Sequence, residues 1–126
     1  MTMQTTRRAF LATLLCLFAT TALAGAQPPR TPAAEIEALV QRVAASRGVV
    51  FIRNGTEHTA ADAAQHLRRK LAASKGRIRT PEAFIEQLGS RSSITGKPYR
   101  VRLPDGRTMD SAVWLHGLLR DIRAGH

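Results

Sequence analysis

The stretch VVFIRNGTEHTAADAAQHLRRKL, residues 49–71, changes its pattern at Thr59. Before Thr59, the apolar and β-branched residues 49–53 lead into Asn54-Gly55, a strong signal for a tight turn between two strands. After Thr59, which is a good N-cap residue, apolar side chains recur along one helical stripe. A short hairpin followed directly by an amphipathic helix indicates an α+β fold. The predicted buried stripe of this helix is Ala60, Ala63, Ala64, Leu67 and Leu71.

Two more helices are predicted on either side of this stretch. The first begins near Thr31, with Pro32 at its first position, and ends near Gly48. The other starts at Thr80-Pro81-Glu82 and ends at Gly89, which stands where a C-cap glycine belongs. The residues predicted to face the core are Ile36, Leu39, Val40 and Val43 in the first helix, and Phe84, Ile85 and Leu88 in the second.

The C-terminal part predicts a strand, a turn and a last helix. Residues 99–103 alternate apolar and basic side chains, which is typical of a half-buried strand, and Asp105-Gly106 is a turn. Asp110 or Ser111 then caps a helix with an apolar side at Ala112, Leu115, Leu119 and Ile122. We therefore expect an α+β fold of about four short helices packed with one or two small β-hairpins in a single compact domain.

The first 26 residues have the pattern of a cleaved secretory signal peptide. Arg7 and Arg8 precede an apolar run over residues 9–23, and small residues place cleavage after Ala24 or Ala26. The arginine pair followed by Phe-Leu also fits twin-arginine export, so the general secretory and twin-arginine routes both stay open. We expect a flexible spacer over 27–34, a globular domain over 35–126, and no stable membrane insertion after cleavage.

Charge and cysteine content restrict the partners. The chain has 19 Lys and Arg against 9 Asp and Glu, a formal net charge of +10, which becomes +8 when the two leader arginines are removed. Export argues against nucleic acid, and leaves phospholipid headgroups, lipopolysaccharide phosphates and acidic wall polymers as candidate anions. The single cysteine, Cys16, lies in the leader, so the exported chain has no disulfide, thiol nucleophile or cysteine-ligated metal.

The stretch GSRSSITGKPY, residues 89–99, invites two catalytic interpretations. A nucleotide-binding P-loop is rejected because Gly89 and Gly96 enclose six residues instead of four, and Pro98 stands where the hydroxyl should be. A strand also follows, where a P-loop needs a helix N-terminus. Weaker anion binding by Arg91 and Lys97 stays open.

A serine hydrolase is the alternative enzymatic hypothesis. Ser92 or Ser93 would need a base among His58, His66 and His116, but the chain has no Gly-x-Ser-x-Gly elbow. The competing interpretation is that the hydroxyls bond locally around a helix end.

Metal binding has less support than either serine hypothesis. Asp62 and His66 share a helix face and could supply two ligands, whereas a catalytic zinc site uses three. An Asp62–His66 surface pair is therefore favoured. We expect no metal and no cofactor.

Several longer segments resemble the YfeK-like family, small exported proteins of Gram-negative bacteria that form a domain of unknown function. They are FIRNGTEHTAADAAQHLRRKL, RIRTPEAFIEQLGSRSSITGKPYRVRL and WLHGLL. The most specific pieces are Phe51-x-Arg53-Asn54-Gly55 and Ser92-Ser93-x-x-Gly96-x-Pro98-Tyr99, and the likeness runs from about residue 36 to 122. This chain interrupts the family's serine run with Arg91. The resemblance implies a periplasmic setting and brings no activity, cofactor or catalytic residue.

The leading functional hypothesis is a non-enzymatic periplasmic domain that binds an envelope protein or an anionic envelope component. The small serine hydrolase and a structural or stability protein without a ligand site remain alternatives. Two candidate partner-binding surfaces are predicted, and the sequence leaves open whether they adjoin. The first comprises Arg53, Asn54, His58, His66, Arg69 and Lys70, and the second comprises Ser92, Ser93, Lys97 and Tyr99.

Overall fold

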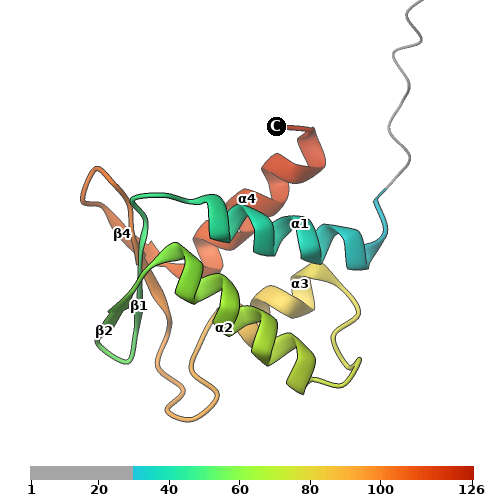
Figure 1. Cartoon of the computed structure of the whole chain (residues 1–126), viewed down its shortest axis with the longest axis horizontal. Coiled ribbons are helices and arrows are strands. Elements are labelled where there is room, and N and C mark those ends of the chain that lie inside the picture. Colours follow the sequence, from blue (N-terminus) through green and yellow to red (C-terminus); the bar gives the residue numbers. More distant parts are fainter. Residues whose placement is uncertain (1–29) are drawn as a thin grey trace, which may run out of the picture.

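The computed structural model describes residues 30–126, so the predicted signal peptide lies outside the described residues. Four α-helices, one π-helical turn and four short strands follow each other in the predicted α+β order (Figure 1). The elements are α1 (Pro32–Ala45), β1 (Val50–Arg53), β2 (Thr56–His58), α2 (Ala60–Ala73), α3 (Pro81–Phe84), η1 (Ile85–Gly89), β3 (Arg100–Arg102), β4 (Thr108–Asp110) and α4 (Ser111–Ala124).

Three threonines begin three of the helices. The hydroxyls of Thr31, Thr59 and Thr80 each accept a hydrogen bond from the backbone N–H three residues later, at 3.2, 3.2 and 3.1 Å. Each bond satisfies one of the backbone donors that a helix N-terminus leaves without a partner. The predicted starts are confirmed, and α1 includes residues 32–34, which the predicted spacer also claimed.

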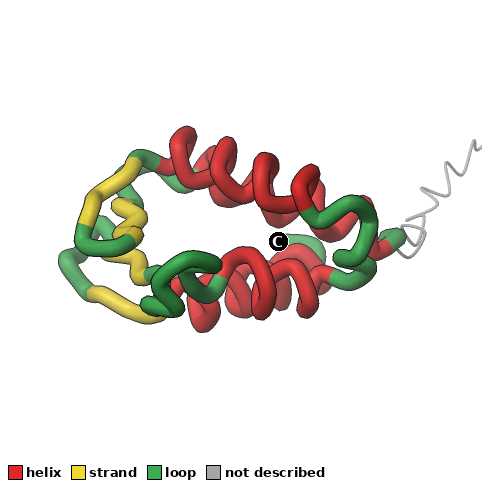
Figure 2. The backbone as a smooth tube through the Cα atoms, turned by 90° about the horizontal axis from the view of Figure 1, so that it is seen from below, coloured by secondary structure: helices red, strands yellow, loops and turns green. Residues whose placement is uncertain are grey.

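The two hairpins form one antiparallel sheet of order β2-β1-β3-β4. Asn54 and Gly55 both have positive φ, 50° and 77°, which is the conformation that a two-residue hairpin turn requires. The central register pairs Phe51 with Val101, and it brings the two hairpins edge to edge. The sequence left a second hairpin open, and β4 completes it by pairing with β3, although only the Asp105-Gly106 turn and a helix cap at Asp110 or Ser111 were predicted there. Figure 2 shows this sheet at one end of the helices.

The core is built around α1, which contacts α2, α3 and α4. Its Leu39, Val40 and Val43 are completely buried. The sheet joins this core through Phe51, whose ring meets Trp114 of α4 edge to face with 5.3 Å between the ring centres. The predicted apolar faces of all four helices are confirmed. Other buried members are Ile36, Val49, Ala63, Ala64, Leu67, Phe84, Ile85, Leu88, Val101, Leu115, Leu119 and Ile122.

Gly89 is not the C-cap glycine that its position predicted. It ends η1 without the positive φ that such a cap requires, and Ser90 follows it as the cap residue. The reason for glycine is space, since a Cβ at this position would lie 2.6 Å from Cδ1 of the buried Leu115. The glycine therefore allows α4 to pack directly against η1.

Charged side chains cover the outer face of the sheet. Arg100 on β3 pairs with Asp110 on the neighbouring strand β4 at 2.6 Å, and Arg102 on β3 reaches past β1 to pair with Glu57 on β2 at 2.7 Å. Asp110 precedes α4 as predicted, but its carboxylate bonds Arg100 and makes no capping bond to the helix. Within residues 30–126, no helix has the length and apolar character needed to span a membrane.

Candidate functional site

The loop between η1 and β3, residues 90–99, is a small closed hairpin. The Tyr99 N–H donates to the Ser90 carbonyl and the Ser92 N–H donates to the Lys97 carbonyl, both at 2.9 Å. Beyond the inner of these two bonds the chain reverses over residues 92–96, which we call the Ser92 turn. The predicted interpretation as a loop leaving a helix is confirmed, with a paired structure that the sequence did not indicate.

Ser92 holds this turn together. Its side chain is buried, and its oxygen accepts hydrogen bonds from the backbone N–H groups of Ile94 and Thr95, both at 3.2 Å. The Asn54 amide also donates to it, at 3.4 Å. An oxygen that accepts three hydrogen bonds has a structural role. This agrees with the hypothesis of local hydrogen bonding, which the sequence offered as the alternative to a serine nucleophile.

The two predicted surfaces adjoin. Asn54 in the β1–β2 turn bonds Ser92 and accepts a hydrogen bond of 2.7 Å from the Thr95 hydroxyl. On the other side of the loop, Nε2 of His66 lies 3.3 Å from the Tyr99 hydroxyl. Side chains from β1, α2 and the 90–99 loop therefore form one continuous site.

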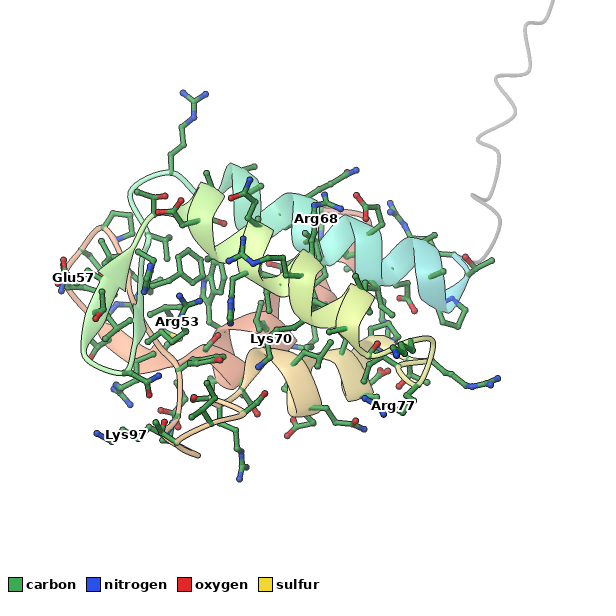
Figure 3. The ribbon with its side chains drawn as sticks, turned by 60° about the horizontal axis from the view of Figure 1, so that its bottom comes forward. Arg53, Glu57, Arg68, Lys70, Arg77 and Lys97 are labelled. Atoms are coloured by element: carbon green, nitrogen blue, oxygen red, sulfur yellow. The ribbon has the colours of Figure 1, made fainter. Side chains whose placement is uncertain are left out.

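Lys70 and Tyr99 form the fixed centre of this site. Nζ of Lys70 donates to the Leu88 carbonyl at 2.9 Å, and to the Arg91 carbonyl and the Tyr99 hydroxyl at 3.3 Å each. The same nitrogen lies 5.0 Å from the centre of the Tyr99 ring, within the range of a cation–π contact. Figure 3 shows Lys70 directed toward the 90–99 loop, with Arg53 beside it and Lys97 farther out.

Basic side chains gather around His66. We call Arg53, His58, His66, Arg69 and Lys70 the basic cluster. Burial and the charges of Arg53, Lys70 and Arg69 lower the pKa of His66 to about 4, because each disfavours a further proton. Burial and the charge of Arg53 likewise lower the pKa of Lys70, and burial raises the pKa of Tyr99. His66 is therefore neutral at physiological pH.

Seven of the nine acidic side chains are engaged elsewhere, and Asp62 and Asp121 form no ion pair in the part of the chain that the structure describes. Among the described residues, the ion pairs use Glu35, Glu37, Glu57, Glu82, Glu86, Asp105 and Asp110, and none of these pairs includes a member of the basic cluster. Arg91 and Lys97 likewise have no ion-pair partner in that part of the chain. The cationic side chains of the site thus have no ion-pair partner within residues 30–126.

A small apolar hollow of about 40 Å³ lies beneath the basic cluster. Arg53, His58, His66 and Tyr99 line it together with core side chains of α2 and α4. Its volume is roughly that of two or three water molecules, so it suits only a small group.

The favoured Asp62–His66 pair is wrong, because His66 turns instead to Tyr99. No group of three His, Cys, Asp or Glu that could hold a metal ion occurs within residues 30–126. The described histidine hydrogen bonds join His66 to Tyr99 and His116 to Glu86, so neither leads to Ser92 or Ser93.

One exposed residue of this region was not among the predicted site residues. Ile94, in the middle of the Ser92 turn, is 95% exposed. An isoleucine enclosed by serines, a threonine and a glycine was a visible signal, because turns favour polar residues. Thr95, which bonds Asn54, was missed as well.

Comparison with known proteins places most of the described chain. The family of unknown function DUF5329 matches residues 30–123. The uncharacterized protein YfeK of Salmonella typhimurium is 46% identical over 66 residues, which are 52% of this chain and 55% of that protein. The match therefore covers about half of the relative's length. No solved structure matches.

Proposed function

Because this chain belongs to a family of unknown function, DUF5329, we propose from its site that it is a non-enzymatic binding module for an anionic component of the bacterial envelope. The predicted signal peptide supports a periplasmic place of action. The ligand would carry a phosphate or carboxylate group and would meet the protein at the basic cluster.

The unneutralised charge of the basic cluster carries this proposal. Arg53, Arg69 and Lys70 lie close enough to His66 to disfavour a proton on it. The chain has nine acidic residues, but within the described residues none of them forms an ion pair with these three cations. Like charges held together raise the free energy of the folded protein. An anion bound among them removes that repulsion.

The geometry assigns different roles to the cations. Lys70 is held by two carbonyls and Tyr99, so it contributes a fixed charge. Arg53 and Arg69 form no hydrogen bond to another described side chain, and their guanidinium groups suit the oxygens of phosphate or carboxylate. Charge-assisted bonds of about 1.5–3 kcal/mol each give an isolated phosphate roughly millimolar affinity. A larger ligand would add contacts.

Titration of the isotope-labelled protein, residues 27–126, with inorganic pyrophosphate tests the proposal. We expect amide and side-chain shifts at Arg53, His66 and Arg69, and weaker binding as salt rises, because the contact is electrostatic. The Arg53→Ala/Arg69→Ala variant should bind at least tenfold more weakly. Equal affinity in that variant, or salt-independent binding, would refute the proposal.

The matched control is Arg79→Ala/Arg120→Ala. It removes the same charge from two exposed arginines outside the basic cluster that form no ion pair in the described part of the chain. It should retain nearly full affinity. If both double variants lose affinity equally, only net charge matters and no site exists.

A further inference from the structure

Ile94 is exposed to solvent in a turn that several hydrogen bonds fix. Its side chain is 95% exposed, whereas the core isoleucines are almost fully buried. The Ser92 oxygen fixes the backbone N–H of Ile94, and the Gly96 N–H donates to the Ser92 carbonyl at 2.9 Å. Thr95 ties the same turn to Asn54. The hydrogen bonds of the turn therefore keep Ile94 exposed.

The surroundings of this apolar tip are basic and polar. Exposed Arg91 and Lys97 flank the Ser92 turn on its two arms, and neither forms an ion pair in the described chain. The sequence has no acidic residue between Gln87 and Pro104. In Figure 1 the loop carrying the turn, drawn in orange, extends beyond the helices and strands around it. Figure 3 shows Lys97 pointing outward from it.

A single exposed apolar side chain flanked by two cations matches a lipid surface better than a protein partner. Protein interfaces need a cluster of large side chains at their centre. At an anionic bilayer, one apolar tip enters among the upper acyl chains while neighbouring Lys and Arg remain at the phosphates. Arg91 and Lys97 are exposed three residues to either side of Ile94, so their side chains can reach such phosphates when Ile94 points into the bilayer.

We propose that the Ser92 turn docks on anionic phospholipid bilayers by inserting Ile94 between headgroups. This inference rests on the proposed function and names the source of the anion. Arg91 and Lys97 contact phosphates beside the inserted tip, and the basic cluster next to the turn, linked through Asn54, takes a headgroup of the same leaflet. One apolar residue and a few cations give reversible binding that salt weakens.

Co-sedimentation with vesicles tests the inserted tip. We expect residues 27–126 to bind vesicles of phosphatidylglycerol and phosphatidylcholine, and to leave pure phosphatidylcholine unbound. Ile94→Ser should lower the partition coefficient at least fivefold and leave pyrophosphate affinity unchanged. The matched control is Val113→Ser, because Val113 is the other large exposed apolar residue of the described chain, at 60%, and lies on α4. It should bind as the parent does.

Insertion is read separately with a fluorescent label. Residues 27–126 contain no cysteine, so Ile94→Cys and Val113→Cys each accept one polarity-sensitive dye. The dye at 94 should shift to the blue on anionic vesicles, and the dye at 113 should not. Unchanged vesicle binding in Ile94→Ser with no shift at 94 overturns docking, while intact pyrophosphate binding leaves the proposed function standing. Loss of pyrophosphate and vesicle binding alike in the parent protein overturns both.

Discussion

Nζ of Lys70 lies 3.3 Å from the Tyr99 hydroxyl and 5.0 Å from the centre of the Tyr99 ring. The same ammonium donates to the carbonyls of Leu88 and Arg91. One side chain of α2 therefore joins the end of η1, the start of the 90–99 loop and the residue before β3. This lysine is part of the scaffold of the site as well as part of its charge.

Lys70→Met should destabilise the protein by about 1–3 kcal/mol, because it leaves half-buried carbonyl and hydroxyl groups without their charged donor. Chemical denaturation monitored by circular dichroism measures the change. Lys97→Met is the control, since the exposed Lys97 side chain forms no ion pair or hydrogen bond with another described side chain, and its effect should be near zero. Equal effects of the two substitutions would contradict the scaffold role.

The stability should fall as pH falls from 6.5 toward 4. With a pKa of about 4 in the folded protein, His66 remains neutral while the unfolded chain takes up a proton near pH 6.5. Protons bound only by the unfolded state lower the free energy of unfolding, and the loss is complete below pH 4. Partial exposure of His66 reduces the effect to about 1 kcal/mol.

Titration of the imidazole signals by NMR gives the pKa of His66 directly, and pyrophosphate should raise it. The groups that set it are the cations Arg53, Arg69 and Lys70, with His58 on β2. His66→Gln should flatten the pH dependence of stability, whereas His126→Gln at the exposed C-terminus should not. A pKa near 6.5 in the free protein would contradict the described cluster.

Gly89→Ala should cost about 1–3 kcal/mol, because the new methyl group would overlap Cδ1 of the fully packed Leu115. Gly117 in α4 provides the opposite control. A Cβ there would meet only the end of Arg120 at 3.6 Å, so Gly117→Ala should stabilise the helix by about 0.5–1 kcal/mol. Thermal denaturation of both variants measures the two changes in stability. An unchanged stability of Gly89→Ala would contradict the close packing, because α4 would then move away from η1 at little cost.

Ser92→Ala should cost about 1–2 kcal/mol and speed hydrogen exchange at Ile94 and Thr95, since both amides lose their acceptor. Ser93→Ala, at an exposed serine next to it, should change neither quantity.

A fluorophosphonate probe applied to the parent protein and to the Ser92→Ala and Ser93→Ala variants tests the serine hydrolase hypothesis. Labelling of the folded parent that disappears in either variant would favour hydrolysis over binding.

Local signals explain which parts of the fold were predictable. Asn54-Gly55 needs only its own backbone conformation to make a turn, and Thr59 needs only the amide of Asp62 to start a helix. The pairing of β1 with β3 joins residues about fifty positions apart, and no local pattern sets that register. The sequence therefore predicted the first hairpin and left a second one open, while their union in one sheet required the tertiary fold.

The site divides in the same way. Residue types and approximate positions of both candidate surfaces were predictable, because basic and hydroxyl residues cluster in the sequence. Their union depends on Asn54 reaching Ser92 across 38 positions. The partner of His66 was predicted wrongly, since helical spacing brought Asp62 into consideration and only the fold brings Tyr99. The predicted C-cap role of Gly89 was wrong for a similar reason, because the neighbour that requires a glycine there, Leu115, comes from a later helix.

The contact between Arg123 and Glu35, near the two ends of the described fold, bears on how the chain assembles. Arg123 bonds Glu35 at 2.7 Å and also reaches Glu82, so the last helix fastens the first one to α3. A chain emerging N-terminus first from the ribosome makes α1 early and α4 last. Until α4 arrives, the apolar stripe of α1 has no complete cover. Folding therefore finishes only after α4 has emerged, and in the interval the nascent chain is a substrate for chaperones and proteases.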